Sequence, residues 1–179
     1  MQRGVAAALL LAVLGLALAT WFASESIEAD LLAREVSEPA ADPGSLGLEF
    51  AAVDIPGPLG NYPAWVVGAV EGEPAVWAVV VHDGAETRDA VLDLIPTLTG
   101  RELVTLVATY RGDAGAPPAP GNRHALGADE WEDVEAAVRF AAESGATAVV
   151  LVGRGTGGSA VLSLLSESEA ELPIAAAVV

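Results

Sequence analysis

A glycine-rich turn is the segment whose residue types and spacing point most directly to chemistry. Residues 153–158 read Gly-Arg-Gly-Thr-Gly-Gly, between an apolar run at 147–152 and a segment with helical apolar spacing at 159–166. A sharp turn between a buried strand and a helix can present a nucleophile, in the pattern G-x-S-x-G, with helix amides facing a developing oxyanion. It can also bind a dinucleotide pyrophosphate, in the pattern G-x-G-x-x-G.

Both patterns match only in part. Gly153, Gly155 and Gly158 satisfy the dinucleotide spacing, whereas the nucleophile pattern fits in frame except that Gly155 stands where serine is required. A dinucleotide turn normally follows the first strand of its domain and needs an acidic residue about 20 positions further on. At least four strands are expected before this turn, and the sequence ends at Val179 before that position can be read. A dinucleotide-binding module is therefore an alternative interpretation, and the favoured interpretation needs no cofactor.

The order of the apolar segments predicts the elements that position this turn. Strands are expected at 46–54, 63–70, 75–81, 103–110, 147–152 and 173–179, and helices from residue 86, from residue 129 and at 159–166. This order predicts an α/β fold with a mostly parallel sheet, helices on both faces and an antiparallel hairpin at one edge. Functional residues in such folds follow the carboxyl ends of strands, which directs attention to His82-Asp83-Gly84, to Tyr110-Arg111-Gly112-Asp113 and above all to the turn.

Several stretches resemble an α/β-hydrolase of the small, membrane-anchored serine-hydrolase kind. They are Pro58–Trp65, Val79–Gly84, Thr109–Arg111, Leu126-Gly127 with Glu130-Trp131, and Val150–Gly158. The resemblance runs from about residue 46 to 179 and implies a partial α/β-hydrolase sheet, hydrolysis of a small ester or amide, and a serine nucleophile. It also implies backbone oxyanion donors at Thr156 and in the loop of Asp83 and Gly84, and places Gly153, Gly157 and Gly158 around the nucleophile position.

The sequence departs from that family at three points. Gly155 has no side chain, His82-Asp83-Gly84 replaces the usual His-Gly, and the family's acid and base lie beyond the elbow, where this sequence ends at Val179. Glycine relieves backbone strain at an elbow, so its presence should cost activity and not folding. We therefore expect an inactive or incomplete hydrolase, with no catalytic side chain assigned and a partner chain or missing segment completing the sheet. A non-catalytic, membrane-tethered binding domain is the third interpretation.

The remaining polar residues have simpler expected roles. His82 is expected to orient its loop, His124 to be solvated, and Arg111 to form a structural salt bridge. Ser159 and Ser163 are expected to be ordinary helix residues. The sequence has no cysteine and two histidines, which disfavours a metal site.

The N-terminus predicts export or membrane attachment. Residues 4–22 carry no charge, Arg3 precedes them, and Ala17-Leu18-Ala19 offers a signal-peptidase site. We expect a single-pass anchor at 4–22 or a cleaved signal, then a linker at 23–45, and a truncated α/β-hydrolase-like domain at 46–179 on the extracytoplasmic side. The net charge of −17 argues against nucleic-acid binding.

Overall fold

The computed structural model describes residues 13–24, 37–68 and 75–179. The chain separates into two units, Met1–Ala33 and Arg34–Val179. In the first unit, residues 13–24 are helical. No helix within the described ranges combines the length and the apolar character that a membrane span needs. The predicted anchor at 4–22 begins in residues that lie outside those ranges.

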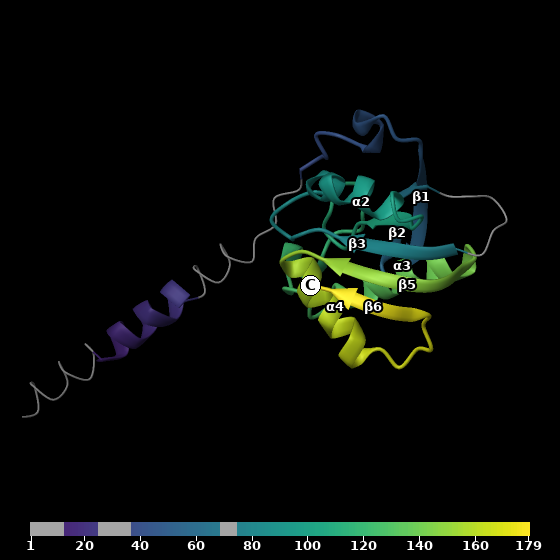
Figure 1. The fold of residues 1–179 in the computed structure, drawn as a ribbon. Helices are drawn as coiled ribbons and strands as arrows, with labels where there is room; N and C mark the ends of the chain where they lie inside the picture. Colours follow the sequence, from purple (N-terminus) through teal and green to yellow (C-terminus); the bar gives the residue numbers. More distant parts are fainter. Residues whose placement is uncertain (1–12, 25–36, 69–74) are drawn as a thin grey trace, which may run out of the picture. The chain divides into compact units, whose positions relative to one another are not determined.

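The described part of the second unit contains one six-stranded sheet with the order β1-β2-β4-β3-β5-β6 (Figure 1). The strands are β1 (Phe50–Gly57), β2 (Gly60–Val67), β3 (Ala75–Val81), β4 (Val104–Ala108), β5 (Ala146–Gly153) and β6 (Ile174–Val178). The hairpin β1–β2 is antiparallel and joins β4 antiparallel, whereas β3 runs parallel to β4 and β5, and β5 parallel to β6. The predicted α/β class, with an antiparallel hairpin at one edge, is confirmed.

Helices cover both faces of this sheet. One face packs against the 3₁₀ helix η2 (Arg88–Leu94) and α2 (Ile95–Thr99), and the other against α3 (Trp131–Glu143) and α4 (Thr156–Glu167). Two further 3₁₀ turns, η1 (Pro43–Leu46) and η3 (Pro120–Asn122), lie in loops. Successive side chains of a strand point to opposite faces. Val79 therefore belongs to the α3–α4 core and Val80 to the η2–α2 core, and neither is exposed. The continuous apolar run of β3 is explained by this double burial.

Several predicted boundaries are wrong for local reasons. The first strand begins at Phe50 and runs through Pro56 and Gly57, which the sequence places in a turn. Proline is tolerated there because β1 is an edge strand. Pro96 lies in the first turn of α2, where its missing N–H breaks no helical hydrogen bond. The final helix begins at Thr156, directly from the glycine turn.

A buried ion pair fixes the end of β4 to the start of α3. Arg111 donates from Nε to Asp133 Oδ2 and from one terminal nitrogen to Oδ1, both at 2.8 Å, and its backbone N–H also donates to Oδ2. Glu132 accepts a further bond from the guanidinium at 2.7 Å. The Arg111 side chain is 5% exposed and that of Asp133 is 0% exposed. The structural salt bridge expected of Arg111 is confirmed, and it is not available to a substrate.

Replacing Arg111 with methionine should destabilise the second unit strongly, because it leaves the Asp133 carboxylate buried without its partner. The expected loss in free energy of unfolding is about 3–5 kcal/mol, measured by chemical denaturation. Arg139→Met is the matched control, since Arg139 pairs with Glu135 one turn away on α3 with its side chain 54% exposed. That change should cost less than about 1 kcal/mol. Equal losses in the two variants would contradict the assigned role of Arg111.

Candidate active site

Strand register brings the two halves of the candidate site together. In the parallel pair β3–β5, Val81 lies opposite Gly153. The backbone N–H of Arg154 donates to the Val81 carbonyl at 3.0 Å, so the segments that follow β3 and β5 leave the sheet side by side. Asp83 and Gly155, each two residues beyond these partners, therefore meet at the carboxyl edge of the sheet.

The turn from β5 to α4 has the tight geometry of a nucleophile-bearing turn. Gly155 has φ 51° and ψ −120°, a combination that residues with a Cβ adopt only with strain. A Cβ at residue 153 would lie 2.6 Å from Gly158 Cα, and one at residue 157 would lie 2.6 Å from the Val81 carbonyl oxygen. Close backbone packing therefore requires glycine at 153 and 157. Gly158 is less constrained, because a Cβ there would first meet Val179 at 3.4 Å.

The space beside Gly155 is filled by the carboxylate of Asp83. A Cβ at residue 155 would overlap this carboxylate, with Oδ1 at 2.8 Å and Oδ2 closer still. Asp83 Oδ1 accepts hydrogen bonds from the Thr156 amide at 3.3 Å, the Thr156 hydroxyl at 3.2 Å and the Ala85 amide at 3.4 Å. The amide of Thr156, expected to serve an oxyanion, therefore already faces an anion of the chain itself.

The environment of Asp83 favours its charged form. Partial burial raises the pKa of this carboxyl, but hydrogen bonds from Thr156, Ala85 and Gly84 outweigh it, and the net pKa lies below the ordinary value. Hydrogen bonds to the ionised form of an acid produce this direction. The three residues predicted as oxyanion-site members, Thr156, Asp83 and Gly84, thus lie together, with the Asp83 side chain as acceptor.

His124 also lies at this site, which the sequence did not predict. A Cβ on Gly84 would come within 2.7 Å of His124 Cε1 and 3.2 Å of Thr156 Oγ1. The expectation that His124 is merely a solvated loop residue is therefore wrong. Its loop is held by Glu130, 1% exposed, which accepts hydrogen bonds from the amides of Ala125 and Gly127 at 2.9 and 2.8 Å. The acidic start of α3 therefore includes a buried acceptor.

His82 is buried and has the positioning role expected of it. Its Nδ1 lies 2.7 Å from the Asp83 carbonyl oxygen and its Nε2 lies 3.0 Å from Asp113 Oδ2. The ring stacks on Tyr110, with centroids 4.8 Å apart. These contacts fix the backbone of Asp83. They also hold the His82 ring between Asp113 and Tyr110, away from the turn at Gly155. Within the described residues, no group of three potential ligands could hold a metal ion.

Comparison with solved structures identifies the architecture. An esterase of Pyrococcus furiosus is 14% identical with a TM-score of 0.65, and the match covers 82% of this chain and 56% of the esterase. An epoxide hydrolase from an endophytic Streptomyces is 20% identical with a TM-score of 0.50, and the match covers 65% of this chain and 33% of that enzyme. The second unit has a partial α/β-hydrolase fold. No protein-family model matches the sequence, and a search of curated proteins finds no match.

In enzymes with an α/β-hydrolase fold, the nucleophile lies on a strand-to-helix turn called the nucleophile elbow. The turn from β5 to α4 at residues 153–157, here called the elbow, has the same strand-turn-helix form. The structure places glycine at its centre, and the hydrogen-bond donors around it face Asp83. This chain spans 56% of the length of the Pyrococcus esterase that it matches.

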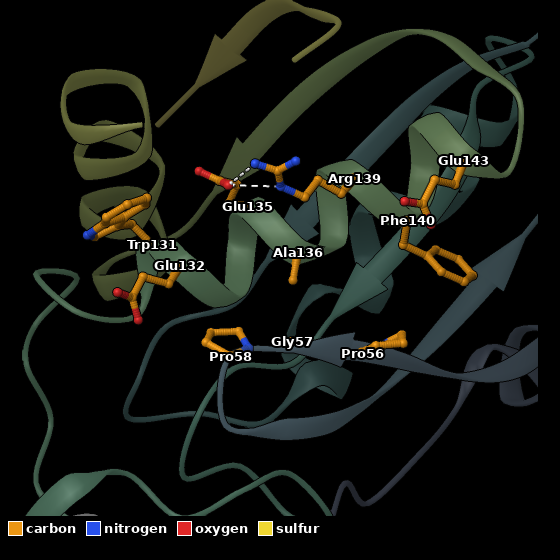
Figure 2. Close-up of a pocket in the computed structure, with 10 residues that line it drawn as sticks. All are labelled: Pro56, Gly57, Pro58, Trp131, Glu132, Glu135, Ala136, Arg139, Phe140 and Glu143. Atoms are coloured by element: carbon orange, nitrogen blue, oxygen red, sulfur yellow. Dashed lines mark hydrogen bonds and ion pairs between the residues drawn. The ribbon is translucent and has the colours of Figure 1, made fainter. Parts of the chain in front are cut away.

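A separate groove of about 480 Å³ lies between the β1–β2 turn and α3 (Figure 2). Its lining is Pro56, Gly57, Pro58, Trp131, Glu132, Glu135, Ala136, Arg139, Phe140 and Glu143. These residues include no serine or histidine. Glu132 accepts a hydrogen bond from Arg111, and Glu135 accepts bonds from Arg139. The groove therefore offers no nucleophile with an adjacent base, and the elbow remains the candidate site.

The overlap between Asp83 and residue 155 predicts energetic coupling between these positions. Gly155→Ala should destabilise the protein by about 1–3 kcal/mol through backbone strain, and by more through the clash. In an Asp83→Gly background the clash is absent, so the cost should fall by about 0.5–3 kcal/mol in a double-mutant cycle. Gly158→Ala, on α4 with room for a Cβ, is the matched control and should not couple to Asp83. Additive costs for Gly155 and Asp83 would show that the carboxylate does not occupy this space.

The lowered pKa of Asp83 predicts a pH-dependent contribution to stability. A carboxyl whose folded-state pKa lies below its unfolded value of about 3.9 stabilises the fold above that pH, and the gain is lost as pH falls through the folded value. The stability difference between the wild type and Asp83→Asn should therefore be constant above about pH 5 and shrink below about pH 4. Thermal unfolding across this range measures it. A difference that stays flat down to the acid limit of folding would contradict the ionised, hydrogen-bonded carboxylate.

Proposed function

We propose that the second unit is a serine-hydrolase-like domain, ancestrally an ester or amide hydrolase, that forms no acyl-enzyme at its elbow. The observation that carries the proposal is Gly155, which retains the strained backbone of the nucleophile position but has no side chain. Removing the nucleophile from a catalytic triad costs about 10⁶ in turnover in a well-studied protease. Without a side chain at this position, no oxygen is available at the centre of the elbow to attack an acyl carbon.

The oxyanion donors support the same proposal independently. Acyl transfer requires amide donors aimed at the oxygen that becomes negative in the tetrahedral intermediate. The Thr156 amide is directed instead at Asp83 Oδ1. The elbow therefore departs from a working serine hydrolase in two components, the nucleophile and the donor set.

The dinucleotide alternative finds no support in this geometry. A pyrophosphate would need the amides at the start of α4 and would place negative charge against the helix N-terminus. The Asp83 carboxylate already lies there and is ionised, so it would both compete for the Thr156 amide and repel a phosphate.

The substrate of the ancestral reaction would be a small ester or amide. In α/β-hydrolases, the acid and the base of this reaction come after the nucleophile elbow in the sequence. Strand β6 presents an unpaired apolar edge in the described residues, with Val178 60% exposed. Exposed edges of this kind recruit a further strand. We propose that a partner chain can supply that strand.

Export or membrane attachment through the N-terminus is proposed from the character of the helix at 13–24. Its large apolar side chains are exposed: Val13, Leu14, Leu16, Leu18, Trp21 and Phe22. A lipid phase or a signal-recognition pathway provides the apolar surroundings that such a helix needs. An intact mass for the protein purified from its own cells separates a retained anchor from a cleaved signal.

The native protein should not react with a fluorophosphonate probe, because no serine lies at the elbow. Intact mass spectrometry after incubation should show no adduct under conditions in which an active serine esterase is labelled completely. Ser159→Ala and Ser163→Ala control for weak reaction at the two serines of α4. Stoichiometric labelling of any serine in the native protein would overturn the proposal.

A further inference from the structure

The Asp83 carboxylate lies where a catalytic elbow needs open space. In a working elbow, the nucleophile side chain projects from the turn, and the adjacent amides bind the oxygen of the acyl group. Here the carboxylate overlaps the position that a Cβ on residue 155 would take, and its Oδ1 accepts from the first amide of α4. The Asp83 side chain therefore occupies both the space of a side chain at residue 155 and the binding position at the Thr156 amide.

The surrounding groups stabilise this carboxylate without forming an ion pair with an arginine of the turn. Arg154 turns away, with its guanidinium 2.7 Å from the Ala90 carbonyl and 2.8 Å from Asp93 Oδ2. The N-terminus of α4 supplies the positive end of a helix dipole. The Asp83 carboxylate thus accepts hydrogen bonds from two backbone amides and from the Thr156 hydroxyl. His124 borders the same space beside Gly84.

The hydrogen bonds to Asp83 are long, between 3.2 and 3.4 Å. Charge-assisted bonds to a carboxylate usually measure about 2.7–2.9 Å. The site therefore holds its carboxylate in place without an optimal fit, and a free carboxylate that can adjust its position would satisfy the same donors.

We propose that Asp83 is an intramolecular ligand that closes the oxyanion site of the elbow, so that the site binds a small free carboxylate once the Asp83 side chain is removed. The inference rests on the proposed function, in which the elbow is an inactive hydrolase site. Beyond the missing nucleophile, the oxyanion site of the elbow is also blocked by the Asp83 carboxylate. A substitution at Gly155 alone would therefore not reopen it, because the carboxylate would still compete for the Thr156 amide.

The test is acetate binding by Asp83→Ala. Acetate reproduces the excised carboxylate, and sodium chloride at equal concentration controls for ionic strength. In Asp83→Ala, acetate should raise Tm saturably by about 3–6 °C over chloride when it is about tenfold above its Kd. The wild type should show no difference between acetate and chloride. Asp54→Ala, which removes an exposed carboxylate from β1, is the matched control and should behave as the wild type does.

A second measurement guards against poor folding of the variant. In Asp83→Asn the amide side chain still fills the space, so this variant should fold and show no acetate effect. The backbone amide resonance of Thr156 should shift with acetate in Asp83→Ala and stay unchanged in Asp83→Asn. A folded Asp83→Ala without acetate-dependent changes in Tm or in this resonance overturns the inference and leaves the inactive elbow standing. Fluorophosphonate labelling of the native protein would instead overturn the proposed function, so the two failures are distinct.

Discussion

The parallel pairing of β3 with β5 is the constraint on which the candidate site depends. Because Val81 is opposite Gly153, β3 and β5 end at the same level at the carboxyl edge of the sheet. The loop that contains Asp83 and the turn that contains Gly155 therefore lie in contact. The backbone bond from Arg154 to Val81 extends this pairing one step beyond the sheet. A shift in register would separate the carboxylate from the helix amides that bind it.

Close backbone packing imposes the second constraint. Gly153 and Gly157 lie so near to the start of α4 and the end of β3 that a side chain at either position would collide with main-chain atoms. Gly155 is different, because its neighbour is the side chain of Asp83 and not backbone. The turn thus has glycine at 153 and 157, where its shape requires it, and the space beside Gly155 is filled by a side chain from another loop. Glycine at residue 155 is therefore compatible with the fold, because it adopts the strained backbone of the turn without a side chain.

Sequence patterns predicted the sheet better than the site. The apolar run of β3 and the amphipathic spacing of α3 follow directly from burial, so these elements could be recognised from periodicity alone. The position of His124 could not be predicted, because it depends on how Glu130 holds a loop across the start of α4. The contact between Asp83 and Gly155 depends on how β3 pairs with β5, which the local pattern of neither strand specifies. The sequence marked Asp83 as a departure from His-Gly and as part of an oxyanion loop, but it did not predict where the side chain lies.

The central claim is that an aspartate carboxylate occupies the nucleophile space of this elbow. The most direct measurement is a high-resolution crystal structure of the chain at neutral pH. The account predicts density for the Asp83 carboxylate within hydrogen-bonding distance of the Thr156 amide, beside a Gly155 with positive φ. A carboxylate turned toward solvent, with water or another ligand bound to the Thr156 amide, would contradict it.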